Sequence, residues 1–198
     1  VVHLHGHGST GDQIFTRVDI RKYWLAHYRE RDLSVLSPNL RGNAWMGPAA
    51  AADLRVLLDA VRRQYGFTQY HLLSGSMGGT SNLIYTSLFP DDVAAVIALC
   101  PVSDIRTYHQ WCVEHPGGVV NEIRAAMEAS YGGTPAQVPA RYEAHRAIAH
   151  AAAFTMPLLV IHGTADALIP IEHSRALADR LRAKADFTYR ELPGGNHD

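Results

Sequence analysis

Apolar and polar positions follow a regular rhythm along this chain, with short apolar runs separated by longer amphipathic segments. The apolar runs predict strands at 1–5, 33–36, 69–74, 93–99, 157–162 and 187–192. The amphipathic segments predict helices at 18–29, 48–65, 81–88 and about 172–184. Strands that alternate with helices are typical of a mostly parallel sheet with right-handed crossovers and helices on both faces. We therefore predict an α/β fold.

The rhythm is interrupted between Pro101 and Phe154. This segment contains three helix-like pieces separated by Gly/Pro-rich turns, and no convincing strand. We expect it to be a helical insertion over the carboxyl edge of the sheet, where sites lie in open α/β folds. Its large aromatic side chains could line a pocket under such a lid, but their spacing favours a role in the core of the insertion; they are Tyr108, Trp111, Tyr131 and Tyr142.

The candidate chemistry lies in the stretch LLSGSMGGTSN, which runs from Leu72 to Asn82. Ser76 falls between a predicted strand and a predicted helix, on a turn so tight that only small residues fit two positions away, here Ser74 and Gly78. Such a turn pushes the serine hydroxyl out of the sheet edge, and the following helix points its free amides at the site. The alternative is a Gly/Ser-rich turn that merely begins a helix.

At these residues the chain resembles the α/β-hydrolases, whose nucleophile elbow reads G-x-S-x-G, with Ser74 in place of the first glycine. The resemblance implies that Ser76 is a nucleophile followed along the chain by an acid and then a histidine. Asp166 in HGTADALIP and His197 in PGGNH fit that order. Each follows a predicted strand, so both belong to the same sheet edge as Ser76.

Other residues compete for these roles. Asp166 could simply hydrogen-bond its own loop, and Asp104, after the preceding strand, is a rival acid. The phrase H-G-x-x-D-x-x-x-P favours Asp166. His197 is one of twelve histidines, and its position after the last strand is what distinguishes it.

An acyl-transfer site also needs two N–H donors for the negatively charged oxygen of the intermediate, each worth roughly 3 kcal/mol of barrier. The resemblance implies the amide of Met77 as one donor. The phrase His5-Gly6-His7-Gly8 is similar to the H-G-x-G oxyanion loop of the family, which implies the backbone of His7 as the other donor, with Gly8 as the alternative.

A further phrase, PNLRG at 38–42, is similar to a D-x-R-G loop of the same family. Asn39 replaces its acid, so we expect Arg41 to form a structural ion pair or loop clamp. Asp53 near the start of the next helix suits the helix dipole and needs no functional role.

The resemblance implies a serine hydrolase that cleaves a small carboxylic ester through an acyl-enzyme, with no metal or organic cofactor. The phrases SGSMGG and HGTAD also resemble the prolyl-oligopeptidase branch, so a serine peptidase that acts on short peptides is the alternative. A non-catalytic binding domain on the same fold would be expected if the triad were broken, and here it is whole.

A metal-dependent hydrolase is a rival of another class. Histidines at alternate positions of a strand share one face and can ligate Zn²⁺, as His3, His5 and His7 would, with His162 or Asp166 completing the site. Gly6 and Gly8 favour a turn instead, and this hypothesis leaves Ser76 unexplained.

Composition sets the outer limits. A chain of 198 residues, 47% of them hydrophobic, can bury one sizeable core, so we expect a single domain over 1–198 with its insertion at about 101–154. The net charge of −1, the pI near 6.9 and the lack of a basic run argue against nucleic acid or a membrane surface as partner. No stretch predicts a transmembrane helix.

Two cysteines, Cys100 and Cys112, form no disulfide framework, although one bridge between them stays open. The chain begins at Val1 inside a predicted strand and ends at Asp198 just after a loop. We expect a piece of a longer protein that lacks the first two strands and the last helix of the family. The compartment is therefore poorly fixed, with a cytoplasmic location slightly favoured, and the oligomeric state is open.

Overall fold

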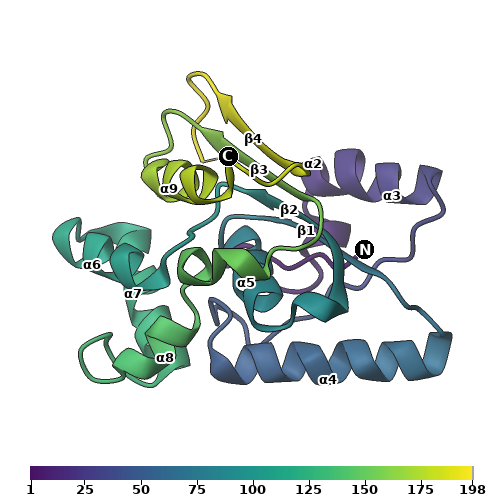
Figure 1. The fold of residues 1–198 in the computed structure, drawn as a ribbon, viewed down its shortest axis with the longest axis horizontal. Helices are drawn as coiled ribbons and strands as arrows, with labels where there is room; N and C mark the ends of the chain where they lie inside the picture. Colours follow the sequence, from purple (N-terminus) through teal and green to yellow (C-terminus); the bar gives the residue numbers. More distant parts are fainter. Residues whose placement is uncertain (198) are drawn as a thin grey trace.

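A computed structural model of the protein describes residues 1–197 and contains a four-stranded parallel sheet with helices around it (Figure 1). The strands lie in the order β1-β2-β3-β4 and pair in parallel throughout. Their bounds are Tyr70–Gly75 for β1, Val93–Leu99 for β2, Leu158–Gly163 for β3 and Phe187–Leu192 for β4. The predicted α/β fold is confirmed, and the carboxyl ends of all four strands meet at one edge.

The first two predicted strands are wrong as regular strands. Val2 forms isolated parallel bridges to Leu36 and to Leu72, and neither 1–5 nor 33–36 has further ladder pairs. The bridging segments still extend the sheet beyond β1, since His3 N donates to Leu36 O at 2.9 Å and Leu73 N donates to Val2 O at 3.1 Å. The turn at Gly6 and the loop at Pro38 take both segments away from the sheet before a longer ladder forms.

The predicted helices are found with three differences in their bounds, and the short helices α1 and η2 were not predicted. The segment 18–29 is divided by a π-helical turn, α5 begins four residues before the predicted start, and α9 ends three residues early. The bounds are α1 (Gln13–Thr16), α2 (Val18–Ile20), the π-helix η1 (Arg21–Leu25), α3 (Ala26–Glu30), α4 (Pro48–Tyr65), α5 (Met77–Leu88), η2 (Pro90–Asp92) and α9 (Glu172–Leu181). Helix α4 is as predicted, with Pro48 in its first turn and Gly66 in the left-handed conformation as its cap.

Helices cover both faces of the sheet, as adjacent residues of β1 show. Leu72 belongs to the main core, together with Leu54 of α4 and Ile84 of α5. Leu73 points to the other face, where a smaller core lies under α1 to α3; its buried members are Ile14, Leu25 and Tyr28. The alternation of side chains along a strand therefore fixes which helices lie on which side (Figure 1).

The insertion is helical. It contains α6 (Ile105–Glu114), α7 (Gly118–Tyr131), α8 (Pro139–Ala144) and the 3-10 segment η3 (Ala147–Ala153), and α6 to α8 lie together at the left of Figure 1. The aromatic set is its core, as predicted: Tyr108, Tyr131 and Tyr142 are fully buried, and Trp111 packs against them partly buried. The rings of Tyr131 and Tyr142 stack at 4.4 Å. A lid role for this insertion stays a prediction.

The insertion is fastened to the loop that precedes α4. Ser130 Oγ donates to Ala44 O at 2.6 Å, and Tyr131 OH donates to Trp45 O at 3.3 Å. These two hydrogen bonds tie the C-terminal end of α7 to this loop.

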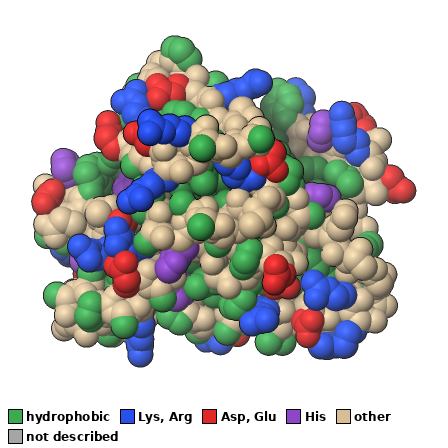
Figure 2. All heavy atoms as spheres, in the orientation of Figure 1, with side chains coloured by type: hydrophobic (Ala, Val, Ile, Leu, Met, Phe, Trp, Pro, Cys, Tyr) green, Lys and Arg blue, Asp and Glu red, His purple; other side chains and the backbone are tan. Residues whose placement is uncertain are grey.

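The surface agrees with the near-neutral composition. Basic and acidic side chains are interspersed over the face shown in Figure 2. None of the helices within residues 1–197 is long and apolar enough to cross a bilayer. Cys100 and Cys112 are not joined in a disulfide.

Candidate active site

Ser76 lies at the junction of β1 and α5 in a strained conformation. Its φ of 59° and ψ of −129° are rare for a residue with a side chain. Such a conformation costs of order 1–3 kcal/mol and persists only where the surroundings enforce it. The enforcement is visible, because Ser76 N donates to Leu99 O of β2 at 2.9 Å and Ser76 O accepts from Thr80 N at 2.9 Å. The half-buried hydroxyl therefore projects from the carboxyl edge of the sheet.

The small residues around this turn are needed for two different reasons. A Cβ atom added to Gly78 would lie 2.1 Å from Leu4 O, so no larger residue fits there without moving backbone. Ser74, fully buried, uses its hydroxyl: Oγ accepts from Leu4 N at 2.8 Å and donates to Asn82 Oδ1 at 3.4 Å. The departure from G-x-S-x-G thus satisfies a buried amide of the neighbouring segment, which the sequence did not reveal.

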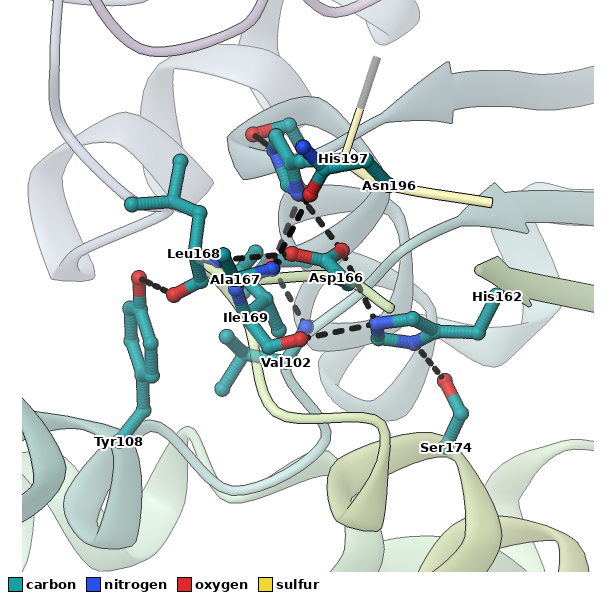
Figure 3. A network of polar contacts seen from close by, with 12 residues as sticks. Val102, Tyr108, His162, Asp166, Ala167, Leu168, Ile169, Ser174, Asn196 and His197 are labelled. Atoms are coloured by element: carbon teal, nitrogen blue, oxygen red, sulfur yellow. Dashed lines mark hydrogen bonds and ion pairs between the residues drawn. The ribbon is translucent and has the colours of Figure 1, made fainter. Parts of the chain in front are cut away.

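The structure brings the three predicted residues together, and Figure 3 shows two of them, Asp166 and His197. His197 Nε2 lies 2.8 Å from Ser76 Oγ, and His197 Nδ1 lies 2.8 Å from Asp166 Oδ2. Because the carboxylate only accepts hydrogen bonds, Nδ1 carries the proton and Nε2 keeps a lone pair for the serine O–H. Ser76, Asp166 and His197 follow the ends of β1, β3 and β4, as their places in the sequence predicted.

Asp166 is held as a carboxylate by four donors. Oδ1 accepts from the amides of Leu168 and Ile169 at 2.9 and 2.8 Å, and Oδ2 accepts from His197 and His162 at 2.8 and 3.1 Å. Burial alone would raise the pKa of Asp166, but the hydrogen bonds from His162, His197 and Ile169 outweigh it and hold that pKa well below its ordinary value. The group that orients His197 therefore stays charged.

His162 is a site residue that the sequence analysis placed only in the metal hypothesis. It is fully buried at the end of β3, its Nδ1 lies 2.7 Å from Ser174 Oγ, and its Nε2 faces both Ile169 O at 3.0 Å and Asp166 Oδ2 (Figure 3). Both partners of Nε2 are acceptors, so the proton is on Nε2 and Ser174 donates to Nδ1. His162 therefore donates a second hydrogen bond to Oδ2 of Asp166, the oxygen that also accepts from His197.

The rival acid Asp104 is committed elsewhere. Its Oδ1 accepts from the amides of Arg106 and Thr107 and so caps α6, and its Oδ2 pairs with Arg146 at 2.7 Å. Among residues 1–197, no hydrogen bond joins Asp104 to His197. The geometry is in favour of Asp166 as the partner of the imidazole.

The backbone amides of the two proposed oxyanion donors, His7 and Met77, differ from that of the alternative, Gly8, in their hydrogen bonding. Gly8 N donates to Asn43 Oδ1 at 2.8 Å and is therefore occupied. Within the described part of the chain, the amides of His7 and of Met77, the first residue of α5, have no acceptor. This pattern favours His7 over Gly8 for the second donor.

The histidines of the metal hypothesis are used in other ways. His3 Nδ1 donates to Leu73 O at 3.1 Å and its ring meets Trp24 edge-on, while His7 Nδ1 accepts from Trp45 Nε1 at 3.2 Å. His5 Nδ1 lies 2.9 Å from Gly6 O. The described residues contain no ligand group formed by these histidines, so the geometry gives the zinc hypothesis at His3, His5 and His7 no support.

The loop prediction for Arg41 is confirmed. Its Nε and NH2 groups pair with Asp53 at 2.6 and 3.2 Å, and both side chains are exposed. This ion pair joins the loop at 38–42 to α4, and neither side chain contacts Ser76.

The profile of the prolyl oligopeptidase family matches residues 46–198, which is most of the chain. The chain belongs to the prolyl oligopeptidase family. Among curated relatives it is similar to the esterase LipC of Mycobacterium tuberculosis, with 49% identity over 43 residues, 21% of this chain and 11% of that protein. It is also similar to a monoacylglycerol lipase of Mycolicibacterium smegmatis, with 25% identity over 172 residues, 74% of this chain and 61% of the relative.

The fold is that of the α/β-hydrolases. A puromycin-hydrolysing peptidase of Mycobacterium tuberculosis superposes with a TM-score of 0.73 at 19% identity, over 100% of this chain and 30% of that one. Our chain spans only 11% of the length of the esterase LipC and 61% of the length of the monoacylglycerol lipase.

Proposed function

We propose that this domain is a serine hydrolase that cleaves small carboxylic esters through an acyl-enzyme. The observation that carries the proposal is the contact of His197 with both Ser76 and Asp166, at 2.8 Å each, in the tautomer that a general base needs. The similarity to an esterase and to a lipase favours ester substrates.

In the proposed reaction His197 Nε2 takes the proton of Ser76 as Oγ attacks the ester carbonyl. The charge on the imidazolium is balanced by Asp166, which is already ionised and hydrogen-bonded. The amides of Met77 and His7 stabilise the oxyanion, and the alcohol leaves with the proton from His197. Water then repeats the cycle on the acyl-enzyme. These steps need no metal or organic cofactor.

A serine peptidase that acts on short peptides is the second candidate. It is favoured by the family to which the chain belongs and by the similarity of the fold to a puromycin-hydrolysing peptidase. The two reactions share nucleophile, base and oxyanion donors, and they differ in the leaving group, since an amine must be protonated to depart while an alkoxide departs more easily.

The test combines a fluorophosphonate probe with two chromogenic substrates. The probe should label wild type and should not label Ser76→Ala. It should also label the control Ser87→Ala, which removes a hydroxyl near the C-terminal end of α5, the helix that follows Ser76. A higher kcat/KM on short p-nitrophenyl esters than on aminoacyl p-nitroanilides supports the esterase, and the reverse order supports the peptidase. Absence of both labelling and turnover would refute the hydrolase and favour a non-catalytic binding domain.

A further inference from the structure

Three metal-ligating side chains lie together at the carboxyl edge of the sheet. The donor atoms of Cys100, Asp166 and His197 are all within 4.8 Å of one another, and residues 1–197 contain no other group of three such side chains. Asp166 and His197 belong to the proposed triad, and Cys100 has no part in it. We propose that these three side chains bind Zn²⁺ or another thiophilic divalent cation, and that the bound metal reversibly inhibits the hydrolase.

The backbone places Cys100 where its side chain reaches the triad. Cys100 directly follows β2, and its amide donates to Ile161 O of β3 at 2.8 Å. The preceding Leu99 O accepts from Ser76 N, so Cys100 is pinned between the strand of the nucleophile and the strand of the acid. Its φ of 45° lies in the left-handed region, which disfavours a residue with a side chain. A strained residue beside a site is a reason to look for a role of its side chain.

The separation of the donor atoms suits a metal ion after a small adjustment. Atoms within 4.8 Å of one another all lie no more than about 2.8 Å from a common point, whereas zinc ligands lie roughly 2.0–2.3 Å from the ion. Each donor therefore moves by less than about 1 Å, which side-chain rotation supplies. Cys100 and His197 are partly exposed, so an ion can enter from their side, whereas the side chain of Asp166 is itself buried.

The ligand types match the same class of metal. A thiolate, an imidazole and a carboxylate are the groups that hold Zn²⁺ in proteins, and thiolate selects against Mg²⁺ and Ca²⁺. Binding releases the thiol proton to solvent and forms the metal–sulfur bond with an electron pair of sulfur, so no oxidant or reductant takes part. Three protein ligands leave a fourth position for water.

Inhibition follows whichever nitrogen of His197 binds the metal. Coordination through Nε2 removes the lone pair that accepts the proton of Ser76. Coordination through Nδ1 displaces the hydrogen bond to Asp166 and with it the tautomer of the base. The inhibitory effect rests on the proposed function, whereas the binding of the metal rests on the ligand geometry alone.

Metal binding is tested by titrating the protein with Cd²⁺ and recording the ultraviolet absorption of the cadmium–thiolate bond. Wild type and the Cys112→Ala control should give the signal, because Cys112 is fully buried in α6 away from the proposed ligands. Cys100→Ser, nearly identical in size, should lose it, and so should Cys100→Gly, which suits the positive φ. Absence of the signal in wild type, or its persistence in both Cys100 variants, would overturn the proposal.

Inhibition is tested by titrating fluorophosphonate labelling with Zn²⁺, each variant being normalised to its own rate in EDTA. Half-inhibition of Cys100→Ser should require roughly tenfold more Zn²⁺ or more, since even outer-shell contacts to a metal are worth that much. Equal sensitivity of Cys100→Ser and wild type would overturn the proposal. A cadmium signal that depends on Cys100, in a protein that no probe labels even in EDTA, would support the metal site and refute the proposed function.

Discussion

Replacing Ser74 by glycine restores the consensus elbow G-x-S-x-G, and we expect it to destabilise the protein. Ser74 is fully buried, and its Oγ is the acceptor for Leu4 N at 2.8 Å. Leu4 is itself only 4% exposed, so water does not replace the hydroxyl easily. The consensus residue thus removes the hydrogen-bond partner of a buried amide.

The magnitude follows from two contributions. A buried N–H left without an acceptor costs about 1–3 kcal/mol, and glycine inside a strand costs about 0.5–1 kcal/mol more through backbone entropy. The free energy of unfolding should therefore fall by about 1.5–4 kcal/mol. For a chain of this size the Tm should fall by roughly 3–16 °C.

Urea unfolding of wild type, Ser74→Gly and Ser74→Ala separates the two contributions. The alanine variant keeps Cβ, so its loss reports the hydrogen bond alone, and the further loss in the glycine variant reports backbone entropy. A glycine variant as stable as wild type would refute the reasoning. An alanine variant without loss would show that the hydroxyl of Ser74 stabilises nothing.

Three further outcomes are expected. Gly78→Ala should lower the unfolding free energy measured in urea by about 1–3 kcal/mol, because its Cβ would lie 2.1 Å from Leu4 O. Unchanged stability would contradict this packing. Burial lowers the pKa of His3 and of His173 from 6.5 to about 4, so the unfolded state binds more protons than the folded state between these pH values. The unfolding free energy should therefore fall by up to about 3 kcal/mol per ring as the pH drops from 6.5 to 4. An unfolding free energy that does not change with pH in this range would argue against neutral buried rings. Burial raises the pKa of Cys112 to about 12, so iodoacetamide at pH 8 should modify it only after unfolding, and mass spectrometry of the native protein checks this.

The arrangement of the candidate site could be predicted because it depends on chain order and on the parallel sheet. Residues that follow the ends of parallel strands share one edge, so Ser76, Asp166 and His197 converge once the strands are identified. The apolar runs identify those strands without ambiguity where they are long, as in β2. Their catalytic roles stay predictions.

The supporting contacts could not be predicted, because they join residues whose proximity exists only in the folded chain. Ser74 meets Leu4 across two neighbouring segments, and His162 turns its ring into the loop that holds Asp166. The short bridges of Val2 show the same limit. The apolar run at 1–5 predicts a strand, but the number of paired residues depends on how soon this segment and its neighbour at Leu36 turn away from each other.

The chain of contacts from the insertion to the oxyanion loop has a consequence for engineering. Tyr131 OH donates to the carbonyl of Trp45, and the indole N–H of Trp45 donates to the ring Nδ1 of His7, the residue whose backbone amide is the proposed second oxyanion donor. We therefore expect libraries that vary α7 to change turnover as well as substrate range, even for substrates that never touch the varied side chains. Selecting such libraries on two dissimilar esters at once would separate variants that reshape the pocket from variants that only disturb the donor.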